Sequence, residues 1–433
     1  MVEIEARLSE LRAMGLNRRM RLVSGPQGPH VVLDGKPVLL LGSDNYLGLA
    51  DHPRVREAAA DAATRWGVGT GGSRLVSGTM TIHRRLEERL AAFVGRESAL
   101  LFGSGYLANV GTISALARPG DVVFSDALNH ASIIDGCRLS RAEVFVYEHR
   151  DTDHLRWGIE RAEGRGAVIV TDSVFSMDGD VAPLAEIVEL SSRFGLRTVV
   201  DEAHGTGALG PGGRGALAQD GLEDQVDVIV GTLGKALGSY GAFVACDRGM
   251  VRYLLNAART FIFSTALPPP AVAAALTALD LLVERPQRAE RLAANAAVLR
   301  GALEREGFDT GGSTTQIVPL VIGEADQAVA VCDAALQRGV FAQAIRPPTV
   351  PDMTSRLRLS VMATHRGAEL VRAAHILAAA ARAHGFDPRR SRPAVAPPAD
   401  LPERADEPWP AAAAAPGSGV FDFEAPEPIR RAA

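Results

Sequence analysis

The sequence predicts an α/β protein with a mainly parallel seven-stranded sheet, followed by a smaller α+β region. Between residues 51 and 285, short apolar runs of strand length alternate with amphipathic helical patterns. This alternation is typical of parallel sheets that are covered by helices on both faces. After Pro286 the pattern changes to long helices around two strand-like runs. A chain of 433 residues that is 47% hydrophobic can bury a large core in more than one substructure.

We expect the chain to divide into four regions with different sequence patterns. They are an N-terminal helix and hairpin segment (1–50), a large α/β region (51–285), a small C-terminal α+β region (286–388) and a Pro/Ala-rich tail (389–433). The tail has few aromatic residues, so we expect it to be disordered.

The first region begins with charged and apolar residues at helical spacing, which predicts a surface helix. It lacks the apolar core of a signal peptide, and we expect a cytoplasmic protein. Two apolar runs within residues 30–41 flank Asp34-Gly35, a dipeptide that favours a tight hairpin turn.

The large region contains seven short apolar runs that predict the strands of one sheet. They are Ala99–Phe102, Val122–Phe124, Val144–Tyr147, Ala167–Thr171, Thr198–Val200, Val228–Val230 and Ala242–Ala245. Ligands of open α/β sheets bind beyond the carboxyl ends of the strands. Lys235, Asp201 and Asp172 are predicted to lie there.

Composition and charge argue against several classes of partner. The 46 basic and 51 acidic residues are spread along the chain. The sequence has no long basic block of the kind that binds a phosphate backbone, so we do not expect nucleic-acid binding. No apolar run has the length of a membrane span. The three cysteines, Cys137, Cys246 and Cys332, are far apart and without metal-ligand spacing, so we expect small core residues and no metal.

Lys235 lies in the glycine-rich segment Gly231–Gly241, directly after a predicted buried strand. A nucleotide-binding P-loop is excluded, because Ile229 and Ala236 occupy positions where that motif needs Gly and Ser or Thr. A buried lysine with a lowered pKa can attack a carbonyl, which suggests a Schiff base. The alternative is a lysine on an exposed glycine-rich loop.

Asp201 and His204 follow another predicted strand and can reach the same ligand. Pyridoxal 5′-phosphate (PLP) needs an acid at its pyridine nitrogen and a donor at its phenolic oxygen, and these two residues could supply them. A turn-capping Asp and a core His would explain the pair equally well without Lys235. The three residues together favour the cofactor.

Further polar segments are predicted to lie around the same edge of the sheet. Gly105 opens a predicted helix whose free N–H groups could hold a phosphate, although a tight turn is an alternative. His130 could cover a flat ring or be a structural histidine, and Ser176 could contact ligand or form a turn. Arg346, in a proline-rich loop from Gln343 to Pro351, could capture a carboxylate or remain a solvated surface residue.

Four motifs make residues 15–385 similar to the α-oxoamine synthases, which are fold type I PLP-dependent transferases. They are Asn129-His-Ala-Ser-Ile-Ile-Asp-Gly136, Asp201-Glu-Ala-His-Gly-Thr-Gly207, Gly231-Thr-Leu-Gly-Lys-Ala-Leu-Gly238 and Phe263-Ser-Thr-Ala-Leu-Pro-Pro269. The chain departs from the family at Ser43-Asp44-Asn45-Tyr46, where many members read Ser-Asn-Asp-Tyr.

The resemblance implies a role for each of a set of residues. Lys235 would carry the cofactor, Asp201 would meet its pyridine nitrogen, His204 its phenolic oxygen and His130 its ring face, with Ser176 near the ring oxygen. Gly105, Tyr106 and Thr232 would contact the phosphate, together with Ser264 and Thr265 from the second subunit of a homodimer. Arg346 would hold the amino-acid carboxylate, and the implied substrate contacts also include Asp44, Ser77, Thr349 and one of Arg18, Arg19 and Arg21.

The implied activity is a PLP-dependent decarboxylative condensation of an amino acid with an acyl thioester. The segments Ala344–Pro351 and Leu100–Phe102 most resemble the biotin-pathway branch, which joins L-alanine to a pimeloyl group carried by CoA or a carrier protein. A relative that uses glycine or serine with another acyl-CoA is an alternative, and a catalytically silent partner subunit is a second.

Overall fold

The computed structural model describes residues 3–13, 17 and 20–391 of the chain. The N-terminal segment contains α1 (Ile4–Ala13), β1 (Val23–Ser24), β2 (His30–Leu33) and β3 (Lys36–Leu40). The Pro/Ala-rich tail predicted from residue 389 lies almost entirely outside the described residues.

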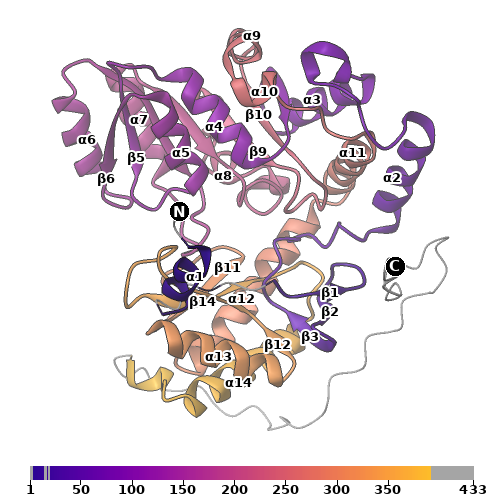
Figure 1. Cartoon of the computed structure of the whole chain (residues 1–433), viewed down its shortest axis with the longest axis vertical. Coiled ribbons are helices and arrows are strands. Elements are labelled where there is room, and N and C mark those ends of the chain that lie inside the picture. The colour runs from indigo at the N-terminus through magenta and orange to yellow at the C-terminus, as the bar shows by residue number, and fades with distance from the viewer. Residues whose placement is uncertain (1–2, 14–16, 18–19, 392–433) are drawn as a thin grey trace.

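The largest part of the molecule is a seven-stranded sheet with its helices (Figure 1). Its elements, in chain order, are α2 (Pro53–Trp66), η1 (Arg74–Gly78), α3 (Thr81–Phe93), β4 (Ser98–Phe102), α4 (Gly105–Leu116), β5 (Val122–Asp126), α5 (Ala131–Ser140), β6 (Glu143–Tyr147), α6 (Thr152–Arg161), β7 (Gly166–Asp172), α7 (Leu184–Phe194), β8 (Arg197–Asp201), η2 (Pro211–Gly213), α8 (Ala216–Asp220), β9 (Val228–Thr232), β10 (Ala242–Cys246), α9 (Arg248–Ala257), α10 (Arg259–Ile262) and α11 (Pro269–Glu284).

The C-terminal part lies below this sheet in Figure 1. Its elements are α12 (Gln287–Arg305), β11 (Ile317–Gly323), α13 (Ala325–Gln337), β12 (Val340–Phe341), β13 (Gln343–Ile345), β14 (Ser355–Ser360), α14 (Gly367–Ala383) and η3 (Pro388–Ser391). Strands β11, β14 and β13 form an antiparallel sheet in that order.

The seven-stranded sheet has the order β4-β10-β9-β8-β7-β5-β6, and only β10 runs antiparallel to its neighbours. All seven predicted strands are confirmed, as is the mainly parallel sheet. Strand residues are buried on both faces because their side chains alternate: Leu101 and Phe124 belong to one apolar cluster, whereas Leu100 and Val123 belong to the other. Helices α4, α5, α9 and α10 contribute to the second cluster.

The predicted hairpin is confirmed, but the sequence did not indicate that a further strand pairs with it. Asp34 and Gly35 both have positive φ, as a tight hairpin turn requires, and β2 pairs antiparallel with β3. The short strand β12, from the C-terminal part of the molecule, then pairs parallel with β3. The loop predicted from Gln343 was wrong at its start, because residues Gln343–Ile345 form β13.

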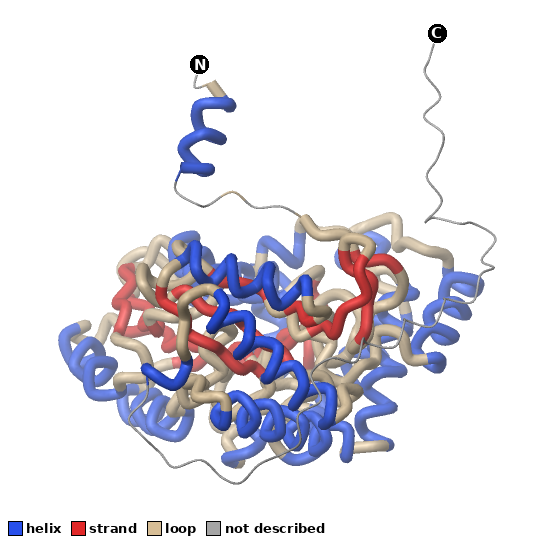
Figure 2. Tube along the Cα trace, turned by 90° about the horizontal axis from the view of Figure 1, so that it is seen from below, coloured by secondary structure: helices blue, strands red, loops and turns tan. Residues whose placement is uncertain are grey.

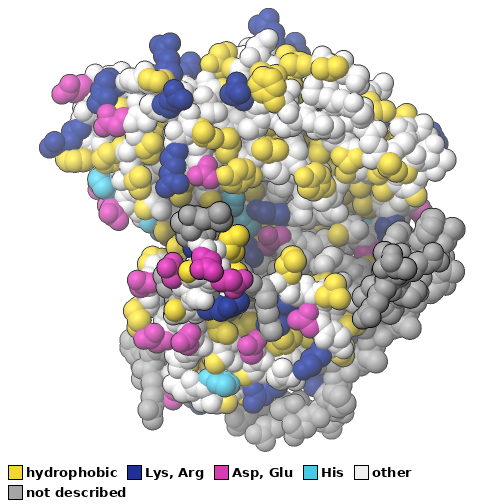
Figure 3. Space-filling view, viewed as in Figure 1, with side chains coloured by type: hydrophobic (Ala, Val, Ile, Leu, Met, Phe, Trp, Pro, Cys, Tyr) yellow, Lys and Arg dark blue, Asp and Glu magenta, His cyan; other side chains and the backbone are white. Residues whose placement is uncertain are grey.

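The N-terminal helix and the cysteines also follow the sequence predictions. Helix α1 has no buried residue and stands apart from the body of the molecule in Figure 2. Cys137, Cys246 and Cys332 are all buried and unpaired. No helix among the described residues is long and apolar enough to cross a membrane. On the face shown in Figure 3, basic side chains predominate in the upper part and acidic side chains gather in the lower half.

Candidate active site

The carboxyl ends of β7, β8 and β9 bring three predicted site residues to one edge of the sheet. Asp172 and Asp201 end their strands in direct register as Cα partners. Lys235 follows the end of β9 by three residues. Parallel strands end on the same edge, so this arrangement follows from the strand pattern that the sequence shows.

Lys235 donates a hydrogen bond from its amine to Nε2 of His204, at 2.7 Å. Burial lowers the pKa of Lys235, and the negative charges of Asp44 and Asp201 oppose this shift only in part. A lowered lysine pKa increases the share of the neutral amine, which is the nucleophilic and basic form.

His204 is buried and is kept in one neutral form by its partners. Burial lowers its pKa well below the ordinary value, and the charge of Lys235 acts in the same direction. The Tyr46 hydroxyl lies 2.7 Å from His204 Nδ1 and 3.1 Å from Asp44 Oδ1. The hydroxyl has one proton, which it donates to Asp44, so it accepts the Nδ1 proton of His204. Nε2 is then left as the acceptor that faces Lys235.

Asp44 is paired with Arg358, a residue for which the sequence indicated no role. Arg358 donates from a terminal guanidinium nitrogen to Asp44 Oδ1 at 3.1 Å and from Nε to the Ser176 carbonyl at 2.5 Å. Burial raises the pKa of Asp44, but the charge of Arg358, together with its hydrogen bond and the charge of Lys235, outweighs this effect and holds the pKa well below its usual range. We call Lys235, His204, Tyr46, Asp44 and Arg358, which these hydrogen bonds connect, the Lys235 cluster. Arg358 brings the predicted residue Ser176 next to this cluster.

Asp201 is held by two N–H groups that donate hydrogen bonds to its carboxylate. Its Oδ1 accepts from the Ala203 N–H at 2.7 Å, and its Oδ2 accepts from the Asn109 side chain at 2.5 Å. Asn109 lies on α4, four residues after Gly105. Helical spacing from the predicted phosphate turn could have found it, because residues four apart share a helix face.

His130 remains exposed although its ring is fixed. Its Nδ1 lies 2.7 Å from Ser132 Oγ, and its backbone N–H donates to Asp172 at 2.7 Å. Desolvation lowers the pKa of His130, Asp201 opposes the shift, and Lys235 adds to it. Burial, followed by the charge of Asp201, raises the pKa of Asp172 well above its usual value. His130 is therefore neutral and presents an exposed imidazole beside two acids.

Glu202 was not singled out in the sequence and acts inside the fold. Its carboxylate accepts from Ser173 Oγ at 2.8 Å and from the backbone N–H groups of Ala216 and Leu217 at 3.1 and 2.7 Å. Burial raises its pKa. These bonds fix the turn that leads from β8 to His204.

The predicted phosphate contacts lie at the ends of β4 and β9. Gly105 opens α4, and a Cβ built there would meet no atom within 4 Å, so the space before this helix is open. Thr232 Oγ1 donates to the Gly241 carbonyl at 3.2 Å. Tyr106 is half exposed, and its hydroxyl donates to Asp135.

Other predicted residues lie away from the Lys235 cluster. Arg346 and Thr349 line a hollow of about 570 Å³ with Arg21, and Arg346 lies 3.4 Å from the Asn17 carbonyl. Ser77 is exposed, and Thr265 is exposed where it pairs with Ser73. Ser264, next to Thr265, is partly exposed. Arg18 and Arg19 lie outside the described residues.

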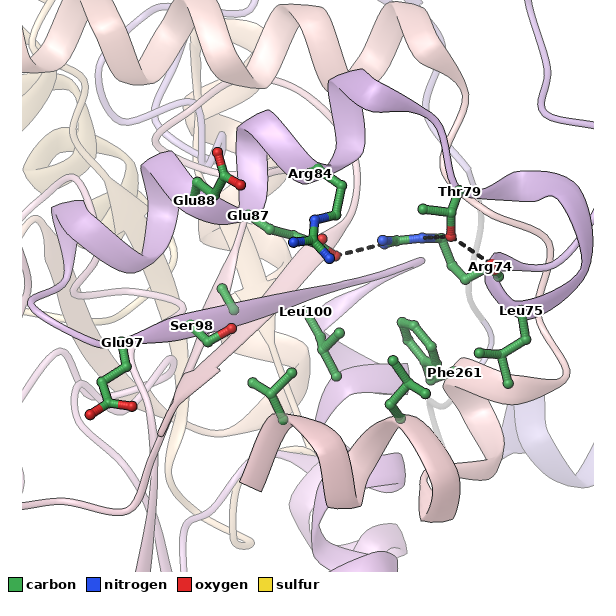
Figure 4. Close-up of a pocket in the computed structure, with 13 residues that line it drawn as sticks. Arg74, Leu75, Thr79, Arg84, Glu87, Glu88, Glu97, Ser98, Leu100 and Phe261 are labelled. Carbon is green, nitrogen blue, oxygen red and sulfur yellow. Dashed lines mark hydrogen bonds and ion pairs between the residues drawn. The ribbon is translucent and has the colours of Figure 1, made fainter. Parts of the chain in front are cut away.

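A second cavity, of about 170 Å³, contains none of the Lys235 cluster (Figure 4). Its Arg74 donates to Glu87 at 2.7 Å, and both side chains are buried. Arg74 Nε also donates to Thr79 Oγ1 at 3.0 Å. This ion pair fixes the η1 turn, which carries the exposed Ser77.

Three comparisons place the chain among known proteins. The profile of the family "Aminotransferase class I and II" matches residues 36–377. An 8-amino-7-oxononanoate synthase from Geobacter metallireducens is 55% identical over 87% of this chain and 97% of its own length. A serine palmitoyltransferase structure with PLP superposes with a TM-score of 0.84 at 36% identity, covering 88% of this chain and 97% of that one. An 8-amino-7-oxononanoate synthase from Francisella tularensis gives a TM-score of 0.69 at 26% identity over 80% of this chain and 98% of that one.

Proposed function

The chain belongs to the α-oxoamine synthases within the aminotransferase class I and II family, and on this premise we propose the reaction that it catalyses. It condenses L-alanine with a pimeloyl thioester to give 8-amino-7-oxononanoate, CO₂ and the free thiol, a step of biotin synthesis. The relative of 55% identity that bears this name supports the choice of substrates. The observation that carries the chemistry is the Lys235 amine held 2.7 Å from a neutral, buried His204.

The residues at the sheet edge fit PLP, the cofactor of this fold family. Lys235 offers an amine to its aldehyde, Asp201 a carboxylate to its pyridine nitrogen, and His204 a ring nitrogen to its phenolic oxygen. His130 offers an exposed ring to the flat face of the cofactor. The open space before Gly105 leaves room for a phosphate at the start of α4. When bound, PLP withdraws electrons from the amino-acid Cα and so stabilises negative charge there.

The protein's own residues then divide the remaining tasks. Lys235, with its lowered pKa, takes the α-proton of the amino acid. Asp201, held by Asn109 and Ala203, keeps a proton at the pyridine nitrogen. His204, whose Nε2 carries no proton, would accept a proton from the phenolic oxygen there, and Tyr46 orients its ring.

Two arginines can hold carboxylates, and the structure favours a different task for each. Arg358 belongs to the Lys235 cluster, so we assign it the amino-acid carboxylate, in place of the Asp44 carboxylate that it now holds. Arg346 shares its hollow with Arg21, and the distal carboxylate of a pimeloyl group would suit this pair of cations.

We further propose a homodimer in which Ser264 and Thr265 reach the phosphate of the partner's site. Three large apolar side chains near this segment are exposed: Leu75 at 49%, Val76 at 83% and Phe263 at 70%. Exposed apolar groups that lie close together are typical of a surface that is covered in an assembly.

The reaction is tested by thiol release from the PLP-loaded full chain. L-alanine, glycine and L-serine are each combined with pimeloyl-CoA, acetyl-CoA, succinyl-CoA and palmitoyl-CoA. We expect L-alanine with pimeloyl-CoA to give the highest kcat/KM. A serine palmitoyltransferase activity is the second candidate, since those structures superpose with the TM-score of 0.84. A preference for L-serine with palmitoyl-CoA would replace the substrates and retain the family.

A further inference from the structure

His149 lies at the carboxyl end of β6, the edge strand of the large sheet, and bridges two acids. Its Nδ1 is 2.9 Å from Asp126 Oδ1, and its Nε2 is 2.9 Å from Asp180 Oδ2. The ring also meets Phe175 edge to face, with centroids 4.4 Å apart. The His149 side chain is 25% exposed, and those of Asp126 and Asp180 are 1% and 12% exposed. This is a largely enclosed bridge outside the Lys235 cluster.

The first acid controls the segment that carries His130. Asp126 ends β5, and its carboxylate accepts from the backbone N–H groups of Leu128 at 2.8 Å and Arg150 at 2.9 Å. The chain reaches His130 four residues after Asp126. The Asp126 carboxylate thus fixes both the start of this turn and the loop that contains His149.

The second acid belongs to the loop that carries Ser176. Asp180 accepts at its backbone carbonyl from the Phe175 N–H at 3.0 Å, which closes the loop 174–181 on itself. The Asp180 carboxylate also receives Arg150 at 3.2 Å. On its other side the loop is held by Arg358, through the carbonyl of Ser176.

The geometry requires a positive charge on His149. An ionised carboxylate only accepts hydrogen bonds, so a ring nitrogen that faces one must carry a proton. Both nitrogens of His149 face carboxylates, and a ring with two N–H groups is an imidazolium. Burial lowers the pKa of His149, but the hydrogen bonds and charges of Asp126 and Asp180 outweigh it and raise the pKa to about 9. Arg150 is the other charged group at this cluster, through its contact with Asp180.

We propose that His149 is a positioning residue of the cofactor site. As an imidazolium it ties the segment 126–130 to the loop 174–181 and so fixes how His130 and Ser176 meet PLP. This inference rests on the proposed function, because it assigns PLP to the neighbouring site. Loss of the proton leaves one of the two carboxylates facing a bare ring nitrogen, and the two segments separate.

The test is the rate at which PLP leaves the full-chain holoenzyme after dilution, measured between about pH 7 and about pH 10. For the parent we expect release to accelerate with a midpoint near pH 9. His149→Gln should release PLP about tenfold faster at neutral pH, because it loses one hydrogen bond to a charged group. Its release rate should also lack the acceleration near pH 9. Release is followed by the visible absorbance of the bound cofactor, without substrate.

A second variant keeps His149 and changes only one acceptor. Asp180→Asn removes one negative charge, so the midpoint of the release profile should move towards neutral pH by about one unit or more. A control variant should keep the parent's profile. His375→Gln removes a remote histidine that pairs with Glu306.

The proposal is overturned if His149→Gln releases PLP at the parent's rate across the pH range, or if Asp180→Asn leaves the midpoint unchanged. The second result decides the matter even if His149→Gln does not fold. A chain that binds no PLP would contradict the proposed function instead. If the chain binds PLP but neither His149→Gln nor Asp180→Asn alters the release profile, only the role of His149 is contradicted.

Discussion

At the scale of single residues, the site depends on hydrogen-bond directions that pass from Lys235 to Asp44. Lys235 donates to His204, His204 donates to Tyr46, and Tyr46 donates to Asp44. Arg358 completes this chain by donating to the same oxygen of Asp44. An amino-acid carboxylate that arrives at Arg358 would therefore be placed beside the base that removes its α-proton.

The two arginines are distinguished by their effects on KM. Arg358→Gln should raise the KM for L-alanine by about tenfold or more, because it removes a hydrogen bond between two charged groups. Arg346→Gln is the matched control, with a smaller effect on that KM and a larger one on the KM for pimeloyl-CoA. Steady-state kinetics with each substrate varied in turn measures both. If Arg346→Gln raises the L-alanine KM and Arg358→Gln does not, the carboxylate belongs to Arg346.

The sequence predicted the part of this site that follows from strand ends. Asp201 and Lys235 come directly after recognisable strands of one sheet, so their convergence follows from topology. Arg358 was missed because it lies on β14, in the C-terminal part of the molecule. The alternation of side chains along a strand does not show which neighbouring element each face of the strand meets. Tyr46 was missed for a similar reason: its partner is 158 residues away.

At the scale of elements, the loop 174–181 depends on a close approach to β11. Gly179 has φ +68°, and a Cβ there would lie 2.1 Å from the Ile317 carbonyl oxygen. Gly195, which caps α7, has φ +67° and no atom within 4 Å of such a Cβ. The two glycines therefore have the same left-handed backbone conformation, which would strain an alanine equally at either position, and differ only in their surroundings.

Gly179→Ala should lower the free energy of unfolding by about 3 kcal/mol or more, as the sum of left-handed strain and overpacking. Gly195→Ala should cost about 1 kcal/mol, for the strain alone. Urea unfolding of both variants measures the difference. Equal losses of unfolding free energy in the two variants would show that β11 can move away from a side chain at position 179 without destabilising the fold.

The turn before α14 joins the C-terminal part to the N-terminal hairpin through a buried histidine. His365 accepts from the Met362 N–H at 2.9 Å, and its Nε2 lies 3.2 Å from the Leu40 carbonyl. Burial lowers its pKa to about 4, from an ordinary value of 6.5. The neutral ring is therefore the form that the fold requires.

His365 should make the protein less stable as the pH falls from about 6.5 to about 4. In this window the unfolded chain binds a proton that the folded chain does not, so stability rises with pH and falls with acid. The full effect is about 3 kcal/mol. Urea unfolding at several pH values, compared between the parent and His365→Gln, measures it. His375→Gln is the surface control, and an unchanged slope in His365→Gln would contradict this assignment.

At the scale of the whole molecule, the sequence predicted the strands of the large sheet but not how the N-terminal hairpin pairs with the C-terminal part. All seven strands of the large sheet could be predicted from apolar runs. The addition of β12 to β3 could not, because a two-residue strand has no periodicity and its partner is about 300 residues away in sequence. The proposed homodimer is a second property of the whole molecule, and it is suggested by the exposed apolar side chains near Phe263.

Phe263→Asp tests the proposed dimer. The phenylalanine side chain is 70% exposed, so an aspartate there should leave the fold of one subunit intact. In a dimer it would bury a charge without a partner, and we expect a shift from dimer to monomer together with loss of thiol release. Light scattering after size-exclusion chromatography measures the mass, with Tyr253→Asp, at an aromatic residue that is 50% exposed, as the control. A parent that is itself a monomer would contradict the proposal.

The central claim, that Lys235 carries PLP, has a direct test because the sequence contains only two lysines, Lys36 and Lys235. Lys36 is at the surface, where its amine donates to Gln337. The PLP-loaded protein is reduced with borohydride, digested and analysed by mass spectrometry. We expect the pyridoxyl mass on Lys235 alone, with no label and no thiol release in Lys235→Ala and parent-like behaviour in Lys36→Arg. A label on Lys36 alone, or an active Lys235→Ala variant, would contradict the claim.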